Sequence, residues 1–266
     1  MRITGKGVWG PPDDHDECIR VLRRAVELGV NFIDTADSYG PYYSEELIRE
    51  ALHPYDGVVV ATKAGLLRTG PDDWTPLGFP AYLRQECETS LRRLGVDTID
   101  LFQLHRIDDN FPLEDQVGEL AALQQEGKVR HIGLSEVGVE QLEAAQKVAP
   151  IVSVQNMYNL TARTAEPVLE ACEAQGMGFI PWFPLATGEL SKPGGALDDM
   201  AAETGATPSQ LALAWLLRRS PVMLPIPGTS SVAHLEENVG AAAIRLDERR
   251  LSAALGNSVY RKESTG

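Results

Sequence analysis

Residues 58–63 read Val58-Val59-Val60-Ala61-Thr62-Lys63, an apolar and β-branched run that closes on a lysine. An earlier run, Asn31-Phe32-Ile33-Asp34, closes on an aspartate, and Tyr39 follows shortly after it. A later run, Ile99-Asp100-Leu101-Phe102-Gln103-Leu104-His105, closes on a histidine. Such runs predict buried strands, in which a terminal charge is costly to pack. The pattern makes sense where the strands are parallel and their carboxyl ends face one shared pocket.

Strand-like runs and amphipathic stretches alternate along the whole chain. Strands are expected at residues 31–35, 57–63, 98–105, 131–135, 151–156, 178–182 and 222–227. Helices are expected at residues 17–28, 44–52, 80–94, 113–125, 138–148, 163–175 and 208–218, with a last one starting at Ser231. Helices between strands imply parallel pairing through right-handed crossovers. We therefore predict an α/β fold, a (β/α)8 TIM barrel, as one domain over residues 1–266, because such barrels need roughly 250 residues.

The first residues of the chain supply neither a full strand nor a dinucleotide fingerprint. Only Met1-Arg2-Ile3-Thr4 is available for the strand that would close the barrel, so the first strand is expected to be truncated. Gly5-Lys6-Gly7-Val8-Trp9-Gly10 matches the G-x-G-x-x-G pattern, but that motif needs a strand before it and a helix after it. Here Pro11-Pro12 follows. We interpret the segment as a loop over the barrel mouth, with Trp9 placed to touch substrate.

Charge and cysteine content limit the partners and the compartment. The net charge of −14 disfavours nucleic acid and anionic membranes as partners. The chain shows no signal-peptide pattern and no apolar run near the ~18 residues that span a bilayer. Its three cysteines, Cys18, Cys87 and Cys172, lack CxxC spacing, so a reduced cytoplasmic location is expected. No metal-ligand spacing is present, and no metal site is predicted.

The four polar residues at the strand ends suit one kind of chemistry. Tyrosine is a weak acid, with an ordinary pKa of about 10. A nearby ammonium such as that of Lys63 is expected to lower this pKa, while Asp34 holds the lysine charged. His105 offers a donor nitrogen to a carbonyl oxygen, and Tyr39 offers a proton to a developing alkoxide. Because no side chain delivers hydride, this site needs a nicotinamide cofactor.

Each of these residues also has a structural interpretation when taken alone. Asp34 would then be a helix cap, Lys63 a surface charge at a strand end, and His105 a histidine satisfied by its neighbours. Their order along the chain together with Tyr39 favours catalysis, because TIM-barrel enzymes place their chemistry at the carboxyl ends of strands.

Several segments resemble the signature of the aldo-keto reductase family. They occur in order and with fitting spacing from about residue 20 to residue 245. The segments are Phe32-Ile33-Asp34-Thr35-Ala36-Asp37-Ser38-Tyr39-Gly40, Ala61-Thr62-Lys63, Gln103-Leu104-His105, Gly133-Leu134-Ser135, Val154-Gln155-Asn156, Ile226-Pro227-Gly228-Thr229-Ser230-Ser231 and Glu236-Glu237-Asn238. No single motif is decisive, whereas the ordered set is specific. Within the family, the chain is similar to bacterial pyridoxal and aldehyde reductases with short carboxyl-terminal loops.

The resemblance implies an NADPH-dependent reduction of an aldehyde or ketone to an alcohol, on a TIM barrel. By resemblance, Tyr39 is the general acid, Asp34 and Lys63 tune it, and His105 orients the carbonyl. The residues implied at the nicotinamide are Ser135 and Gln155 on its carboxamide and Trp182 stacked on its ring. The residues implied at the rest of the cofactor are Phe183, Leu185 and Thr187 along the pyrophosphate, Gly228, Thr229, Ser230, Ser231 and His234 at the 2′-phosphate, and Glu237 and Asn238 at the adenine.

The chain departs from the family pattern at the cofactor. Glu136 replaces the asparagine that often follows the carboxamide-binding serine. Many members carry lysine and arginine at the 2′-phosphate, where this chain has Gly228 and His234. Backbone amides and hydroxyls at a helix start still bind phosphate, so NADPH is favoured over NADH. The tail is short, which predicts a small or open pocket for a carbonyl substrate, with Trp9 and Trp74 as candidate walls.

Two other functions remain open at this stage. A nucleotide-binding regulatory module of the same fold, with little turnover, is compatible with the truncated start and the missing basic pair, because fold does not fix function. A phosphate-binding lyase is also compatible, with the loop at Gly228–Ser231 as its phosphate site and Lys63 forming a Schiff base. The sequence does not give the oligomeric state.

Overall fold

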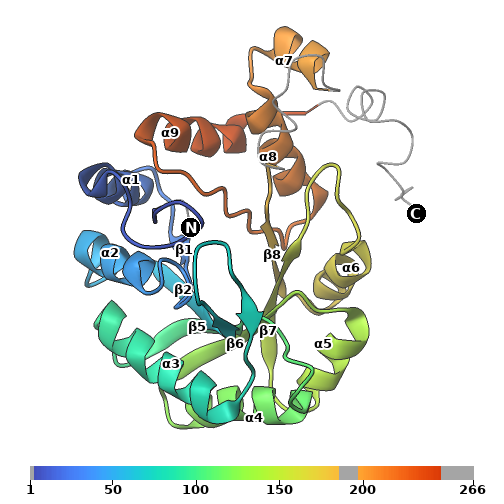
Figure 1. Cartoon of the computed structure of the whole chain (residues 1–266). Coiled ribbons are helices and arrows are strands. Elements are labelled where there is room, and N and C mark those ends of the chain that lie inside the picture. Colours follow the sequence, from blue (N-terminus) through green and yellow to red (C-terminus); the bar gives the residue numbers. More distant parts are fainter. Residues whose placement is uncertain (1–2, 186–196, 247–266) are drawn as a thin grey trace.

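A parallel sheet forms the centre of the computed structural model, which describes residues 3–185 and 197–246 (Figure 1). The sheet has six strands in the order β1-β2-β5-β6-β7-β8, and every neighbouring pair is parallel. The strands are β1 (Phe32–Asp34), β2 (Val59–Ala64), β5 (Ile99–Leu104), β6 (Val129–Ser135), β7 (Ile151–Met157) and β8 (Gly178–Trp182). The predicted α/β class with parallel pairing is confirmed, and each of these strands lies within a few residues of its expected position.

Helices alternate with the strands and lie around the outside of the sheet (Figure 1). They are α1 (His15–Glu27), α2 (Tyr43–Leu52), α3 (Pro80–Leu94), α4 (Leu113–Gln125), α5 (Val139–Gln146), α6 (Glu166–Gln175), α7 (Asp198–Thr204), α8 (Pro208–Arg219) and α9 (Val232–Gly240), followed by the 3-10 turn η2 (Ala241–Ala243). Thr207 caps α8, because its hydroxyl accepts from the Gln210 amide and Pro208 occupies the first turn. This cap fixes the start of α8.

The strand expected at residues 222–227 is present only as a single bridge. Phe179 of β8 donates its amide to the Val222 carbonyl at 2.8 Å and accepts from the Leu224 amide at 2.8 Å. Pro225 and Pro227 follow, and proline has no amide hydrogen to continue a ladder. The segment therefore extends the sheet beyond β8 without forming a full strand, which corrects the predicted element.

Two short features near the barrel mouth were not predicted. β3 (Leu66–Leu67) and β4 (Thr75–Pro76) form a small antiparallel pair between β2 and α3. In the segment before α1, the part of the chain that the structure describes contains no strand. Trp9 instead forms a single bridge with Gly40. Runs as short as β3 and β4 carry too few residues for a period to be recognised.

The core lies between the sheet and its helices, and the strand register aligns the polar strand ends. Val60, Phe102, Leu134 and Phe179 are buried apolar residues on four of the strands. Register places Lys63 beside Gln103 and Ser135 beside Gln155 at the carboxyl edge. The parallel sheet thus holds charged and amide side chains at one end, while its length is covered by helices on the outside.

Neither a membrane span nor a metal centre is found among residues 3–185 and 197–246. None of the helices there is long and apolar enough to cross a bilayer. The same residues contain no group of three or more histidine, cysteine, aspartate or glutamate side chains that could hold a metal ion.

Candidate active site

A buried ion pair joins the ends of β1 and β2. The Lys63 ammonium donates to Asp34 Oδ2 at 2.7 Å and to the Thr35 carbonyl at 2.7 Å. The two charged side chains are 0% and 5% exposed, so neither is solvated by bulk water. Asp34 Oδ1 accepts from the amides of Gln103 at 3.2 Å and Gln155 at 2.9 Å. Because several strands contribute donors to this carboxylate, the pair is fixed by the sheet itself.

Tyr39 lies above this pair in the loop between β1 and α2. Its hydroxyl accepts from Lys63 Nζ at 3.4 Å, and its ring is only 2% exposed. Burial, and next the negative charge of Asp34, raise the pKa of Tyr39 well above its usual value of 10.0. The pKa of Tyr39 is thus raised overall, not lowered as expected from Lys63 alone, because burial is the largest influence on it. The ammonium is neutralised by Asp34, and burial also lowers the pKa of Lys63 itself.

His105 completes the group at the end of β5. Its ring meets the Tyr39 ring edge-on at 5.7 Å between centroids, and its Nδ1 lies 3.3 Å from the Ser38 hydroxyl. Burial lowers the pKa of His105 well below 6.5, and the nearby cations Lys63, Arg106 and Arg68 add to this effect. The imidazole is therefore neutral at physiological pH. Asp34, Tyr39, Lys63 and His105, which were all singled out from the sequence, thus meet at one end of the sheet.

Arg68, which the sequence did not suggest, organises the mouth of the site. Its guanidinium lies 3.6 Å from the Trp74 ring centre and 5.7 Å from that of Trp9. Its N–H groups donate to the main-chain carbonyls of Gly7, Val8, Ser38, Gly70 and Asp73. Trp74 in turn meets Tyr39 edge-on at 6.3 Å between centroids. The glycine-rich segment is thus a loop beside the site, and both candidate wall tryptophans flank one cation.

Replacing Arg68 by lysine is expected to loosen this mouth. Lysine lacks the planar guanidinium with which arginine bonds several carbonyls at once. Each hydrogen bond to a charged group contributes about 1.5–3 kcal/mol. We expect amide hydrogen exchange in residues 5–10 and 70–74 to speed up by about tenfold or more. Arg84→Lys, which alters an arginine on α3 that pairs with Glu119 and Glu126, is the control. Unchanged exchange in R68K would show that Arg68 does not hold the loops.

Asp37 is a buried acid close to the site but outside the group around Tyr39. It is 1% exposed, and its Oδ2 has no hydrogen-bond partner in the part of the chain that the structure describes. Its Oδ1 accepts from the Ser38 amide. Burial, and then the charges of Glu45 and Glu86, raise the pKa of Asp37 well above its usual value. The position therefore favours a neutral side chain.

Asp37→Asn is expected to stabilise the protein, and more so at higher pH. The native pKa of Asp37 lies above its unfolded value, so the folded state holds more protons between the two and loses stability as pH rises through that window. Asparagine removes this loss. The gain is expected to be about 1 kcal/mol or more at pH 8, and smaller at pH 5, by urea unfolding. Asp13→Asn, at an exposed position, is the control. A D37N protein less stable at both pH values would contradict this.

The residues expected at the nicotinamide also gather at the carboxyl edge. Ser135 ends β6, and its hydroxyl accepts from Arg106 at 3.0 Å. Gln155 lies next to it on β7, with its amide nitrogen committed to Asp34. Trp182 ends β8, is half-buried, and has the Arg106 guanidinium 6.0 Å from its ring centre. The set offers hydroxyl, amide and guanidinium groups beside an aromatic ring. Sequence reasoning missed Arg106, whose only signal is its place directly after His105.

The remaining candidate cofactor residues are spread over two regions. Phe183 is exposed in a left-handed conformation, with φ of 61°, and Leu185 packs against the core. Thr187 lies outside the described residues. The residues Gly228, Thr229, Ser230 and Ser231 precede α9, and His234, Glu237 and Asn238 lie on it.

The start of α9 is already engaged by a carboxylate. Glu17 of α1 accepts from the Val232 amide at 3.1 Å, and Thr229 Oγ1 accepts from the Ser231 amide at 3.1 Å. The Val232 amide lowers the pKa of Glu17, which keeps it charged. Glu237 accepts from the Thr207 hydroxyl at 2.5 Å, so its carboxylate is committed to α8. The amides before α9 are thus partly occupied.

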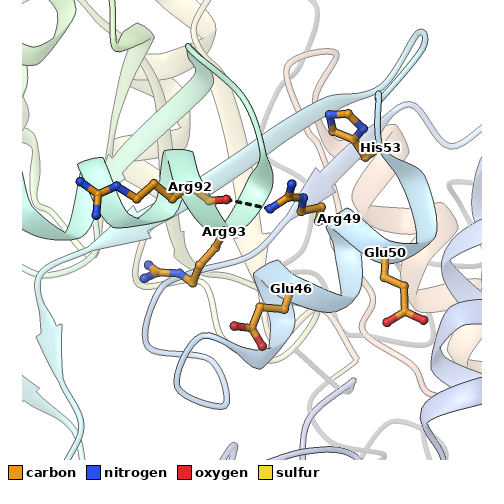
Figure 2. A pocket seen from close by; sticks show the side chains of 6 residues that line it. All are labelled: Glu46, Arg49, Glu50, His53, Arg92 and Arg93. Atoms are coloured by element: carbon orange, nitrogen blue, oxygen red, sulfur yellow. Dashed lines mark hydrogen bonds between the residues drawn. The ribbon is translucent and has the colours of Figure 1, made fainter.

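A surface hollow lies away from these residues. It measures about 670 Å³ and opens between α2 and α3 on the outside of the barrel (Figure 2). Its walls are the charged side chains of Glu46, Arg49, Glu50, His53, Arg92 and Arg93. None of them was a candidate site residue, and none contributes to the group around Tyr39.

Comparison with known proteins agrees with the resemblance seen in the sequence. The model of the family described as the aldo/keto reductase family matches residues 3–254. The chain belongs to the aldo/keto reductase family. It is therefore an oxidoreductase of that family, and the aldo-keto reductase expected from its motifs is confirmed.

Individual relatives place this aldo/keto reductase more closely. It is 58% identical over 246 residues to an uncharacterised oxidoreductase of Schizosaccharomyces pombe, covering 92% of this chain and 80% of the relative. It is 45% identical over 265 residues to pyridoxine 4-dehydrogenase of Escherichia coli, covering 97% and 92%. An aldo/keto reductase structure from Klebsiella pneumoniae, in complex with NADP and acetate, matches with a TM-score of 0.81 at 28% identity, covering 95% of this chain and 89% of that one. The structural match confirms the TIM-barrel class, and of the eight strands predicted for the barrel the described residues form six in the parallel sheet.

Proposed function

We propose that this aldo/keto reductase interconverts an aldehyde or ketone and its alcohol with NADP(H). One observation carries the proposal: the Tyr39 hydroxyl lies 3.4 Å from the Lys63 ammonium, beside the neutral His105. This arrangement presents a protonated phenol and a neutral imidazole at one end of a barrel. The solved relative from Klebsiella pneumoniae was crystallised with NADP, which supports the choice of cofactor.

The groups at the carboxyl edge fit a nicotinamide. A carboxamide needs both a donor and an acceptor, and the Ser135 hydroxyl supplies the two. Gln155 lies beside Ser135, and the half-buried ring of Trp182 offers a face for stacking. We propose these three residues for the nicotinamide, and Phe183 and Leu185 for the pyrophosphate. The residues Gly228, Thr229, Ser230, Ser231, His234, Glu237 and Asn238 are proposed for the adenosine end. A bound reduced nicotinamide supplies the hydride.

The chain's own residues supply the proton and the orientation. Tyr39 stays protonated in the neutral range because its pKa is raised, so it can give its proton to a carbonyl oxygen that gains negative charge. Lys63 stabilises the phenolate that remains, and Asp34 holds Lys63 in place. In the tautomer whose Nδ1 accepts from the Ser38 hydroxyl, Nε2 of His105 carries a proton and is a donor to the carbonyl oxygen. The Lys63 ammonium is committed to Asp34 and the Thr35 carbonyl, which does not support a Schiff base there.

Nucleotide binding and turnover test this proposal directly. We expect NADPH to bind, and its absorbance to fall when pyridoxal or another small aldehyde is added. The name of the Escherichia coli relative motivates pyridoxal and pyridoxine as the first substrate pair. NADPH is expected to bind more tightly than NADH. Two features limit this preference: the Glu17 carboxylate already accepts from the Val232 amide, and residues 228–231 include no lysine or arginine. Failure to bind either nucleotide would reject the proposed function.

A further inference from the structure

Glu136 connects the ends of three strands at the nicotinamide side of the site. It follows Ser135 at the end of β6, is half-buried, and adopts a left-handed backbone conformation with φ of 57°. Its Oε1 accepts from the indole Nε1 of Trp182, at the end of β8, at 2.5 Å. The same oxygen accepts from the Met157 amide, at the end of β7, at 2.6 Å. The carboxylate is therefore anchored to the tryptophan that is proposed to stack on the nicotinamide.

The two groups that hold Glu136 are neutral, so its negative charge is not cancelled by them. An indole N–H and a peptide N–H donate hydrogen bonds without carrying a positive charge. No lysine or arginine forms an ion pair with Glu136 in residues 3–185 and 197–246. The cation in its neighbourhood is Arg106, which bonds to Ser135 and lies 6.0 Å from the Trp182 ring centre. Glu136 thus places a negative charge at the edge of the proposed nicotinamide site.

We propose that Glu136 favours the oxidised nicotinamide and biases this enzyme toward alcohol oxidation. The inference rests on the proposed function. The oxidised nicotinamide ring is positively charged and the reduced ring is neutral, so a nearby carboxylate stabilises only the oxidised form. Tighter binding of the oxidised form loads the enzyme for the reaction in which a carbinol carbon gives hydride to NADP⁺. In this direction Tyr39 first releases its own proton to solvent and its oxygen then takes the proton of the alcohol hydroxyl, so the products are the carbonyl compound, NADPH and a proton.

A merely structural role predicts a different result. If Glu136 only holds the indole, its charge is irrelevant, and any acceptor of the same shape would serve equally well. Glu136→Gln separates these roles, because glutamine keeps the side-chain length and a carbonyl oxygen for both N–H groups but loses the charge. Glu136→Ala removes both the charge and the acceptor, and reports the cost of losing the anchor of Trp182.

Equilibrium binding of NADP⁺ and NADPH, each measured by calorimetric titration, tests the proposal without turnover. For E136Q we expect the dissociation constant of NADP⁺ to rise about tenfold, and that of NADPH to change less than about twofold. For E136A we expect both to weaken, with NADP⁺ losing more. Glu140→Gln, the same charge change at an exposed position in the first turn of α5, is the matched control and should leave the ratio unchanged.

The outcomes distinguish this inference from the proposed function. A ratio of the two dissociation constants that is equal in wild type and E136Q overturns the role of Glu136 and leaves the reductase proposal standing. A wild-type protein that binds neither nucleotide overturns both. Should E136Q fail to fold, Glu136→Asn carries the residue that the family often has here, and the same change of ratio is expected from it.

Discussion

Replacing Tyr39 by phenylalanine should lower the turnover number for carbonyl reduction by about 10³-fold and leave NADPH affinity within about twofold. The expected size follows from the 10²–10⁴-fold that a positioned general acid contributes. The substitution removes one hydroxyl whose described contact is the Lys63 ammonium at 3.4 Å. The ring keeps its packing against Trp74 and His105. Loss of turnover with nucleotide binding retained would therefore locate the defect in proton transfer.

Single-turnover oxidation of bound NADPH is the measurement that isolates this step. Tyr55→Phe is a suitable control, because it removes the hydroxyl of a partly buried tyrosine away from the site, which donates to the Leu94 carbonyl at 2.6 Å. Y55F should reduce carbonyls at the wild-type rate. A Y39F protein with wild-type turnover would reject Tyr39 as the proton donor, and a Y39F protein that no longer binds NADPH would show a cofactor role instead.

The strand-end residues were predictable because they depend on a short repeat of local signals. An apolar run, a terminal polar residue and a following helix recur for Asp34, Lys63 and His105. Parallel pairing then brings such ends to one edge without any knowledge of side-chain contacts. The helices were predictable for the same reason, since α3 and α4 match their expected ranges at both ends. Local periodicity is enough for both of these features.

Contacts between loops were not predictable, because no pattern in the sequence encodes them. Arg68 is held by carbonyls from segments on either side of it, and its neighbours in the sequence give no sign of this. Glu136 was noticed as a departure from the family pattern, but its partner Trp182 lies 46 residues further on. The pKa of Tyr39 was misjudged because the sequence shows which charges are near but not how deeply the phenol is buried.

Replacing Lys63 by methionine should both abolish turnover and destabilise the fold by about 3–5 kcal/mol, the cost of removing one partner from a buried ion pair. Lys63 and Asp34 are 0% and 5% exposed, so the aspartate charge would be left with the amides of Gln103 and Gln155 as its remaining described side-chain donors. Those amides are neutral and cannot offset a buried charge. Urea unfolding measures the loss of stability, and NADPH oxidation measures the loss of turnover.

The double variant Asp34→Asn with Lys63→Met separates folding from catalysis. With both charges gone, neither member of the pair is left as an uncompensated buried charge, so we expect most of the stability lost in K63M to return. Turnover should not return, because the phenolate that Tyr39 forms would still lack the ammonium beside it. Recovery of both stability and turnover would show that Lys63 serves only to neutralise Asp34. Recovery of neither would show that the lysine stem and the Thr35 carbonyl contact contribute more to the fold than the charge does.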